Sequence, residues 1–195
     1  MKKLLFTMAA VAFFATASMA QMSFGLKGGI NLSKINSDFD GDTEKSDNRF
    51  SMNLGGFMVY ELADKMALQP ELLLSFEGGK DDFGGDEVTT ALTAVNIPVL
   101  FRYTVVENLN LLVGPQIGIN VSGQYKNEDG DTEDVEDLSP LTVAFGFGAA
   151  YNVNEKIDLH FRYNAGMTNW YNGDNSDDIK VKVNTIQIGL GYKLK

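Results

Sequence analysis

The sequence predicts an all-β protein, an eight-stranded antiparallel up-and-down transmembrane β-barrel preceded by a cleavable signal peptide. Three observations predict this fold. Apolar and polar residues alternate with a two-residue period, most clearly over residues 66–77, where Gln69, Glu71 and Ser75 separate apolar side chains. Eight segments have this pattern, and each reaches the roughly 9–11 residues that a tilted transmembrane strand needs. The connections between them are alternately long and short, as an up-and-down barrel requires.

The first twenty residues have the composition of a secretory signal peptide. Lys2 and Lys3 precede an apolar run over residues 4–14, and small residues dominate 15–20. A transmembrane helix is the weaker interpretation, because the apolar run is well short of the ~20 residues that a spanning helix needs. We therefore expect a signal peptide at residues 1–20, cleavage after Ala20, and a barrel domain at residues 21–195.

The composition excludes several classes of protein. The formal net charge is −10, and it becomes −12 when Lys2 and Lys3 leave with the signal peptide. Such an acidic chain is not expected to bind nucleic acid or bare anionic lipid. The chain has no cysteine, so no disulfide framework supports it, and its stability must come from the sheet and the membrane.

The alternating pattern gives the strands in chain order. We expect them at residues 22–33, 50–62, 66–77, 90–103, 109–124, 141–153, 157–168 and 184–194. The start of the last strand is uncertain from the pattern. Val181 and Val183 fall on the opposite face from Ile186 and Ile188 if the two-residue alternation is continued through this segment. This mismatch predicts either a β-bulge near residues 180–185 or a strand that begins only near Asn184.

The connections divide into two kinds. Four long ones are rich in Asp, Glu, Gly, Asn and Ser, and three short ones have the length of tight turns. The long connections are expected at 34–49, 78–89, 125–140 and 169–183, and the short ones at 63–65, 104–108 and 154–156. Counting strands from the amino terminus then places both termini in the periplasm and the four acidic connections at the cell surface.

Each strand has one apolar and one more polar face. The fourth strand, for example, presents Val95, Ile97 and Val99 on the face expected to contact lipid, and Asn96 and Arg102 on the other. A soluble β-sandwich or lipocalin-like barrel would instead bury the apolar set. Small inward residues and the grouping of acidic connections at one end favour the membrane barrel.

Aromatic residues at strand ends indicate the two membrane interfaces. Tyr60, Tyr103, Tyr151 and Tyr192 lie near the ends of the even-numbered strands and in the lipid-facing register, so we expect a periplasmic aromatic girdle. The candidates for the outer girdle are Phe50, Phe76, Tyr125 and Trp170, with the registers of Tyr125 and Trp170 left open.

The polar faces predict a charged lumen. Glu71, Arg102, Asp158, His160 and Arg162 all have inward parity, and an eight-stranded barrel is only wide enough for side chains to fill. We expect these charges to neutralise one another, either as structural pairs or as the lining of a narrow pore. His160 is the only histidine and is expected to pair with a carboxylate.

No catalytic residue, metal site or cofactor is assigned. His160 has no serine at an evident partnering position, so the protein is not expected to be an enzyme. The acidic runs at residues 38–44 and 129–134 offer hard oxygen ligands, but their spacing is not that of an EF-hand loop. They are interpreted as solvated loops.

Three segments resemble a known family. Residues 66–75 (MALQPELLLS) resemble the LQPELLYS strand of the PorT-like outer-membrane β-barrel family, often labelled porin family protein. Residues 95–103 (VNIPVLFRY) resemble its IPLLLKY strand, and residues 113–118 (VGPQIG) its GPY(V/L)G strand. The resemblance implies an outer-membrane barrel of a Gram-negative cell, surrounded by outer-membrane lipid and inserted by the barrel-assembly machinery. It supplies no catalytic residues.

Two functions remain open. The first is a structural or surface-interaction role, in which the acidic loops meet a surface protein or another ligand. The alternative is a narrow porin-like channel for ions or small solutes, with Glu71, Arg102 and Arg162 setting its selectivity.

Overall fold

The structure is a computed structural model that describes residues 22–39, 42–83, 86–127, 130–173 and 179–194. The predicted signal peptide lies outside the described residues. Within these ranges, no helix is long and apolar enough to cross a membrane.

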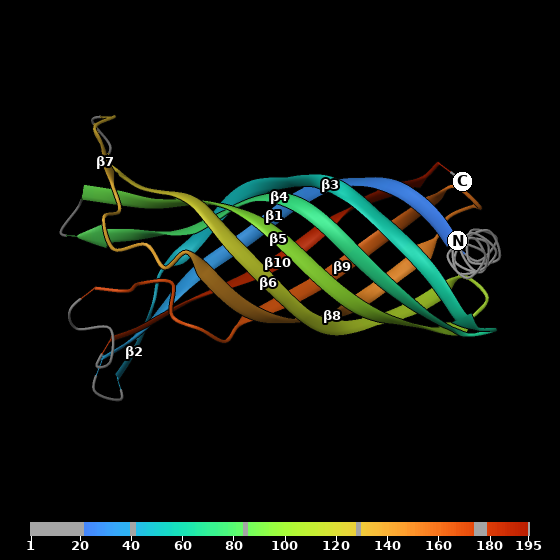
Figure 1. Ribbon diagram of the computed structural model, residues 1–195. Coiled ribbons are helices and arrows are strands. Elements are labelled where there is room, and N and C mark those ends of the chain that lie inside the picture. Colours follow the sequence, from blue (N-terminus) through green and yellow to red (C-terminus); the bar gives the residue numbers. More distant parts are fainter. Residues whose placement is uncertain (1–21, 40–41, 84–85, 128–129, 174–178, 195) are drawn as a thin grey trace, which may run out of the picture.

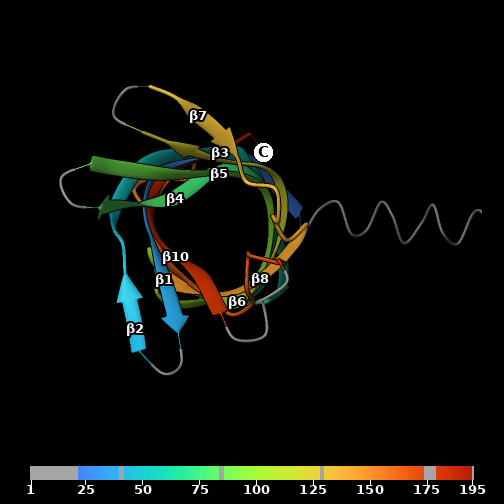
Figure 2. The ribbon, with the colours of Figure 1, turned by 90° about the vertical axis from the view of Figure 1, so that its left-hand side faces the viewer.

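Eight long strands form a closed antiparallel barrel, which confirms the predicted fold class (Figure 1). They are β1 (Met22–Phe39), β3 (Asp47–Ala63), β4 (Met66–Phe83), β5 (Asp86–Val106), β6 (Leu109–Lys126), β8 (Leu141–Asn152), β9 (Ile157–Gly166) and β10 (Ile179–Lys193). Each long strand pairs with the next long strand in sequence, and β10 pairs with β1 to close the ring. Figure 2 shows the closed ring from one end of the barrel. The short strands β2 (Asp42–Lys45) and β7 (Thr132–Asp134) add to the edges of β1 and β6.

The two ends of the barrel differ. Gly25 pairs with Lys193, so the described chain begins and finishes at the same end, which we call the terminal end (Figure 1). The turns after β3, β5 and β8 lie there too. The opposite end, the loop end, carries β2, β7 and the longer connections.

Several strands continue beyond the lengths that the sequence predicted. β4 has 18 residues and β5 has 21, so most of the long connection expected at 78–89 is a two-stranded extension of the wall. A tilted 18-residue strand rises about 45 Å, compared with a ~25 Å apolar band. The sequence pattern did not predict this extension because its residues are largely polar and do not alternate with apolar ones. The strands pair there through backbone hydrogen bonds, which do not depend on side-chain polarity, as in the Lys80–Thr89 pair.

The two faces of the wall have opposite polarity. Leu26 and Phe161 are 56% and 51% exposed on the outside, whereas Asn31 and Gln187 are completely buried on the inside. A soluble barrel would have the reverse arrangement, since water rather than lipid would surround it. The interpretation of the apolar face as lipid-facing therefore holds, and the soluble alternative is wrong.

The predicted irregularity near residue 181 is absent. β10 begins at Ile179, and its ladder with β1 runs without a shift from that residue to Lys193. Val181 and Val183 face inward, where they pack in an apolar cluster with Trp170. The expectation of a bulge was wrong because it assumed a polar interior along the whole lumen, and the loop end of the lumen is apolar.

Gly78 is a position where the wall requires glycine. Its φ is +139°, and a β-carbon there would contact the carbonyl oxygen of Thr90 on β5. At Gly56, by contrast, the nearest atom to such a β-carbon is the carbonyl oxygen of Gly25 at 3.4 Å, an ordinary contact.

We expect Gly78→Ala to lower the free energy of unfolding by about 1–3 kcal/mol through backbone strain and the clash with Thr90. Urea titration of the refolded barrel in lipid vesicles measures this cost. Gly56→Ala is the matched control and should cost clearly less, so equal costs at the two positions would contradict the assignment.

Candidate functional site

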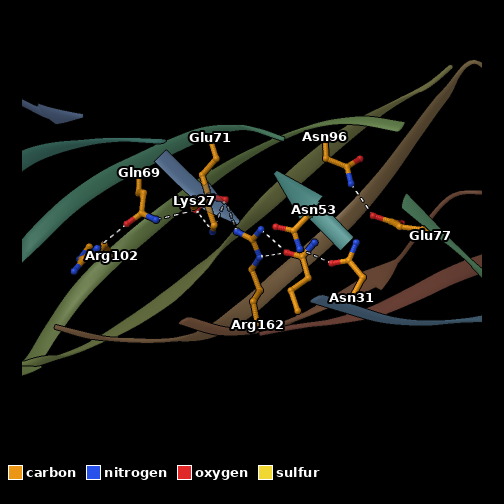
Figure 3. A network of polar contacts seen from close by, with 10 residues as sticks. Lys27, Asn31, Asn53, Gln69, Glu71, Glu77, Asn96, Arg102 and Arg162 are labelled. Carbon is orange, nitrogen blue, oxygen red and sulfur yellow. Dashed lines mark hydrogen bonds and ion pairs between the residues drawn. The ribbon is translucent and has the colours of Figure 1, made fainter. Parts of the chain in front are cut away.

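The centre of the lumen is built around one carboxylate. Glu71 of β4 accepts from the Lys27 ammonium of β1 at 3.0 Å and from Arg162 of β9 at 2.9 Å (Figure 3). The three side chains are at most 3% exposed. Gln69 donates a further hydrogen bond of 2.8 Å to the same carboxylate. We call these four residues and Gln187 the central ion network.

Arg162 is held in a fixed orientation. Its Nε and Nη2 donate to Oε1 of Gln187 at 3.0 and 2.6 Å, while Nη1 reaches Glu71. Three N–H groups of the planar guanidinium thus bind partners on two strands, β4 and β10. This arrangement links opposite parts of the wall through the lumen.

A layer of neutral polar side chains and one carboxylate, Glu77, lies next to this network. The Asn31 amide donates to Ser75 Oγ at 2.9 Å. The Asn53 amide donates to Asn31 Oδ1 at 2.6 Å (Figure 3). Ser75 and Asn96 each donate to Glu77 at 2.8 Å. Buried polar groups are costly when unpaired, so these contacts stabilise the filled interior.

The structure brings together only part of the predicted charge cluster. Glu71 and Arg162 form an ion pair, but Arg102 donates to the amide oxygens of Gln69 and Asn152, at 2.8 and 3.0 Å, rather than to a carboxylate. Asp158 and His160 are buried in the same lumen, 5% and 4% exposed.

The expected pairing of His160 with a carboxylate is not found. Neither ring nitrogen of His160 has a hydrogen-bond partner among the described residues. Asp158 is two positions away on the same face of β9, a Cα separation of about 6.6 Å. Glu71 is already bound by Lys27, Arg162 and Gln69.

Sequence reasoning missed Lys27, which is a central member of the network. Its signal was available, because Lys27 alternates with the outward residues Leu26 and Ile30 and shares the inward parity of Asn31. Applying the two-residue period to the first strand would have added a third cation to the lumen.

Two cavities flank the central ion network. The one at the terminal end has a volume of about 140 Å³ and is lined by Arg102, Asn110 and Asn152, among others. The inner chamber, on the loop-end side, has only about 40 Å³, with Asn96 and Gln116 in its lining. By volume, the inner chamber accommodates no more than a few water molecules.

On the loop-end side of the inner chamber, a cluster of apolar side chains closes the lumen. We call this cluster the apolar cap. It consists of Ile35, Leu92, Trp170 and Val181. Trp170 is 5% exposed, and its backbone N–H donates to the carbonyl of Val181 at 3.0 Å. Its own carbonyl accepts from the Ser139 N–H at 2.7 Å, so both flanking segments hold it in place.

The cap corrects the predicted outer girdle. Trp170 lies inside the mouth of the barrel and Tyr125 is half-buried beside it, so neither is a lipid-facing girdle residue. Phe50, 71% exposed, remains a candidate. The alternation of inward and outward residues does not continue to Trp170, because β9 ends at Gly166 and the chain then turns into the mouth of the barrel.

The tyrosines of the predicted periplasmic girdle all lie near the terminal end. Tyr103, Tyr151 and Tyr192 are 38%, 49% and 47% exposed, and Tyr60 is half-buried opposite Met22. Their interfacial role stays a prediction. Within the residues that the structure describes, no group of three or more His, Cys, Asp or Glu side chains is placed to hold a metal ion.

We expect Glu71→Gln to destabilise the barrel by about 3–5 kcal/mol, because Lys27 and Arg162 would lose their shared carboxylate in a buried site. Lys27→Met should cost less, since the Arg162 pair survives. Urea unfolding in vesicles measures both variants.

The control is the exposed pair between Lys80 and Glu87, with an N–O distance of 2.6 Å. Lys80→Gln should change the free energy of unfolding by no more than about 1 kcal/mol. A Glu71→Gln cost as small as this would show that the central ion network does not stabilise the fold.

Comparison with known proteins supports the assignment to the outer membrane. The family model described as outer membrane protein beta-barrel domain matches residues 15–172. No curated protein matches the chain. Because the match covers most of the chain, the family is established from sequence as well as from the fold.

Solved structures share the architecture at low sequence identity. Ail, the attachment invasion locus protein of Yersinia pestis, is 19% identical with a TM-score of 0.51, over 89% of this chain and 99% of Ail. Neisserial surface protein A is 9% identical with a TM-score of 0.56, over 86% of this chain and 96% of that protein. At these identities the likeness concerns the fold alone. The chain belongs to the outer membrane protein beta-barrel domain family, and its barrel spans the outer membrane of a Gram-negative bacterium.

Proposed function

We propose that this protein is a surface-interaction element, in which the barrel is a closed membrane anchor and the loop end meets partners outside the cell. The observation that carries this proposal is the filled lumen. The central ion network occupies its middle with Lys27, Glu71 and Arg162, and the apolar cap closes its loop end. Passage of a solute would require buried ion pairs to separate and the cap to open, both at a large free-energy cost.

The proposal includes an orientation and a route to the membrane. The short turns and both termini lie in the periplasm, and the loop end is extracellular, as is usual for barrels of this class. The signal peptide at residues 1–20 directs export, and the barrel-assembly machinery inserts the mature domain of residues 21–195. The three sequence motifs support a place within the PorT-like branch of the family.

The charge of the loop end indicates the chemistry of its partners. Residues 131–137 contain five exposed carboxylates, and the whole chain has a net charge of −10. We therefore propose that partners are positively charged, since complementary charge favours encounter and specificity. Ail has been crystallised with the heparin analogue sucrose octasulfate, but a polyanion of that kind would be repelled by this surface.

The first test is electrical. We expect refolded mature protein in a planar bilayer to give no discrete conductance steps, because its lumen is filled by side chains. Heat-dependent gel mobility verifies that the barrel is folded. Steady steps from a verified barrel would overturn the closed-anchor proposal and favour the narrow channel, with Arg102→Gln then tested for altered ion selectivity.

The second test addresses the loop end. We expect the triple variant E133Q/D134N/E136Q, assayed in nanodiscs, to bind a labelled oligolysine several-fold more weakly than the wild type, and raised salt to weaken the wild type as well. The matched control D64N/E107Q/E155Q removes the same charge at the terminal end and should retain binding. Equal losses in the two variants would contradict a loop-end site.

A further inference from the structure

A third pocket lies on the outer side of the apolar cap. This mouth pocket has a volume of about 260 Å³ and is lined by residues of five strands and of the segment after β9. Trp170, Tyr125 and Tyr171 supply its aromatic surface, and Asp81 and Thr90 supply polar groups from β4 and β5. The volume suits a single amino-acid-sized group.

Hydrogen bonds hold the backbone of the segment that carries Trp170 and Tyr171. Trp170 is fixed by the backbone bonds to Val181 and Ser139 described above, and Tyr171 forms an isolated β-bridge with Leu138. The Asn169 side chain accepts from the N–H groups of both Tyr171 and Val181, at 3.1 and 2.9 Å. A binding surface that is held in place before binding loses little conformational entropy on binding.

The mouth pocket is also electronegative. Asp81 lines it directly, and Asp137 and Glu133 are close to Tyr125. Tyr125 lies on the part of β6 beyond the apolar belt, and burial raises the pKa of its hydroxyl, with Tyr171, Asp137 and Glu133 adding to the rise. Aromatic faces next to carboxylates attract ammonium and guanidinium groups, through cation–π and charge interactions.

We propose that the mouth pocket binds a basic amino acid residue, with its ammonium or guanidinium group between Asp81 and the aromatic rings of Trp170, Tyr125 and Tyr171. This inference deepens the proposed surface-interaction function and rests on the loop end being accessible from outside. The residue belongs either to a free amino acid or to a peptide, and the experiment separates these sources.

Trp170 provides the measurement, because it is the only tryptophan in the chain. Its fluorescence is followed while refolded protein is titrated with N-acetyl-arginine amide, with free arginine, and with N-acetyl-citrulline amide, which has nearly the same shape without the charge. We expect a saturable change with the arginine compounds and at least tenfold weaker binding of the citrulline compound. Tighter binding of the capped compound assigns the site to a peptide, and tighter binding of free arginine to an amino acid.

Variants test the residues directly. Asp81→Asn should weaken binding of the arginine compounds about tenfold, and Tyr125→Leu should weaken it by removing an aromatic face. Glu87→Gln is the matched control, because it removes the same charge from the facing strand outside the pocket and should leave binding unchanged.

Equal binding of the citrulline compound, or no binding of either arginine compound by folded wild-type protein, would overturn the inference without needing any variant. The proposed function would fail separately, by conductance in a bilayer or by oligolysine binding that ignores the loop-end carboxylates. The two failures are therefore distinguishable.

Discussion

The closure of the ladder between β1 and β10 is the constraint on which the rest of the molecule depends. Its register runs continuously from the Gly25–Lys193 pair to the Phe39–Ile179 pair, so neither strand presents an open edge to lipid. In a bilayer an unpaired backbone group has no water to bond, and an open sheet would be far too costly. The apolar outer face follows from that closure, because lipid then contacts side chains alone.

Closing the ring with eight long strands also determines what the inside can be. The lumen is too narrow for bulk water, so many inward side chains hydrogen-bond to one another, although His160 has no such partner among the described residues. The Glu71 carboxylate accepts from Lys27, Arg162 and the Gln69 amide at once, and Arg162 also donates to the side-chain oxygen of Gln187. The interior is therefore a packed polar core surrounded by an apolar surface, which is the opposite of the arrangement in a soluble protein.

The strand order and the inward residues could be predicted because alternation is a local property of the backbone. Parity placed Glu71 and Arg162 inside, and it would have placed Lys27 there as well. It could not predict that Arg102 also binds Asn152, because β5 and β8 are not neighbours and their relative height depends on the stagger of the strands in the ring. Trp170 was misplaced for a related reason: it follows β9, where the period ends and the chain turns into the mouth.

The strands differ in length around the ring, so the loop end of the barrel is not the same on all sides. β8 has 12 residues and β9 has 10, whereas β4 has 18 and β5 has 21, so the strand ladder extends farther along one part of the ring than along another. Over β4 and β5 the mouth is bordered by a regular hairpin, whereas beyond β8 and β9 it is bordered by irregular segments joined by the Ser139–Trp170 hydrogen bond and the Leu138–Tyr171 bridge. A neighbouring protein in the membrane therefore meets a different surface when the barrel rotates about the membrane normal. A barrel with strands of equal length would present the same border on every side.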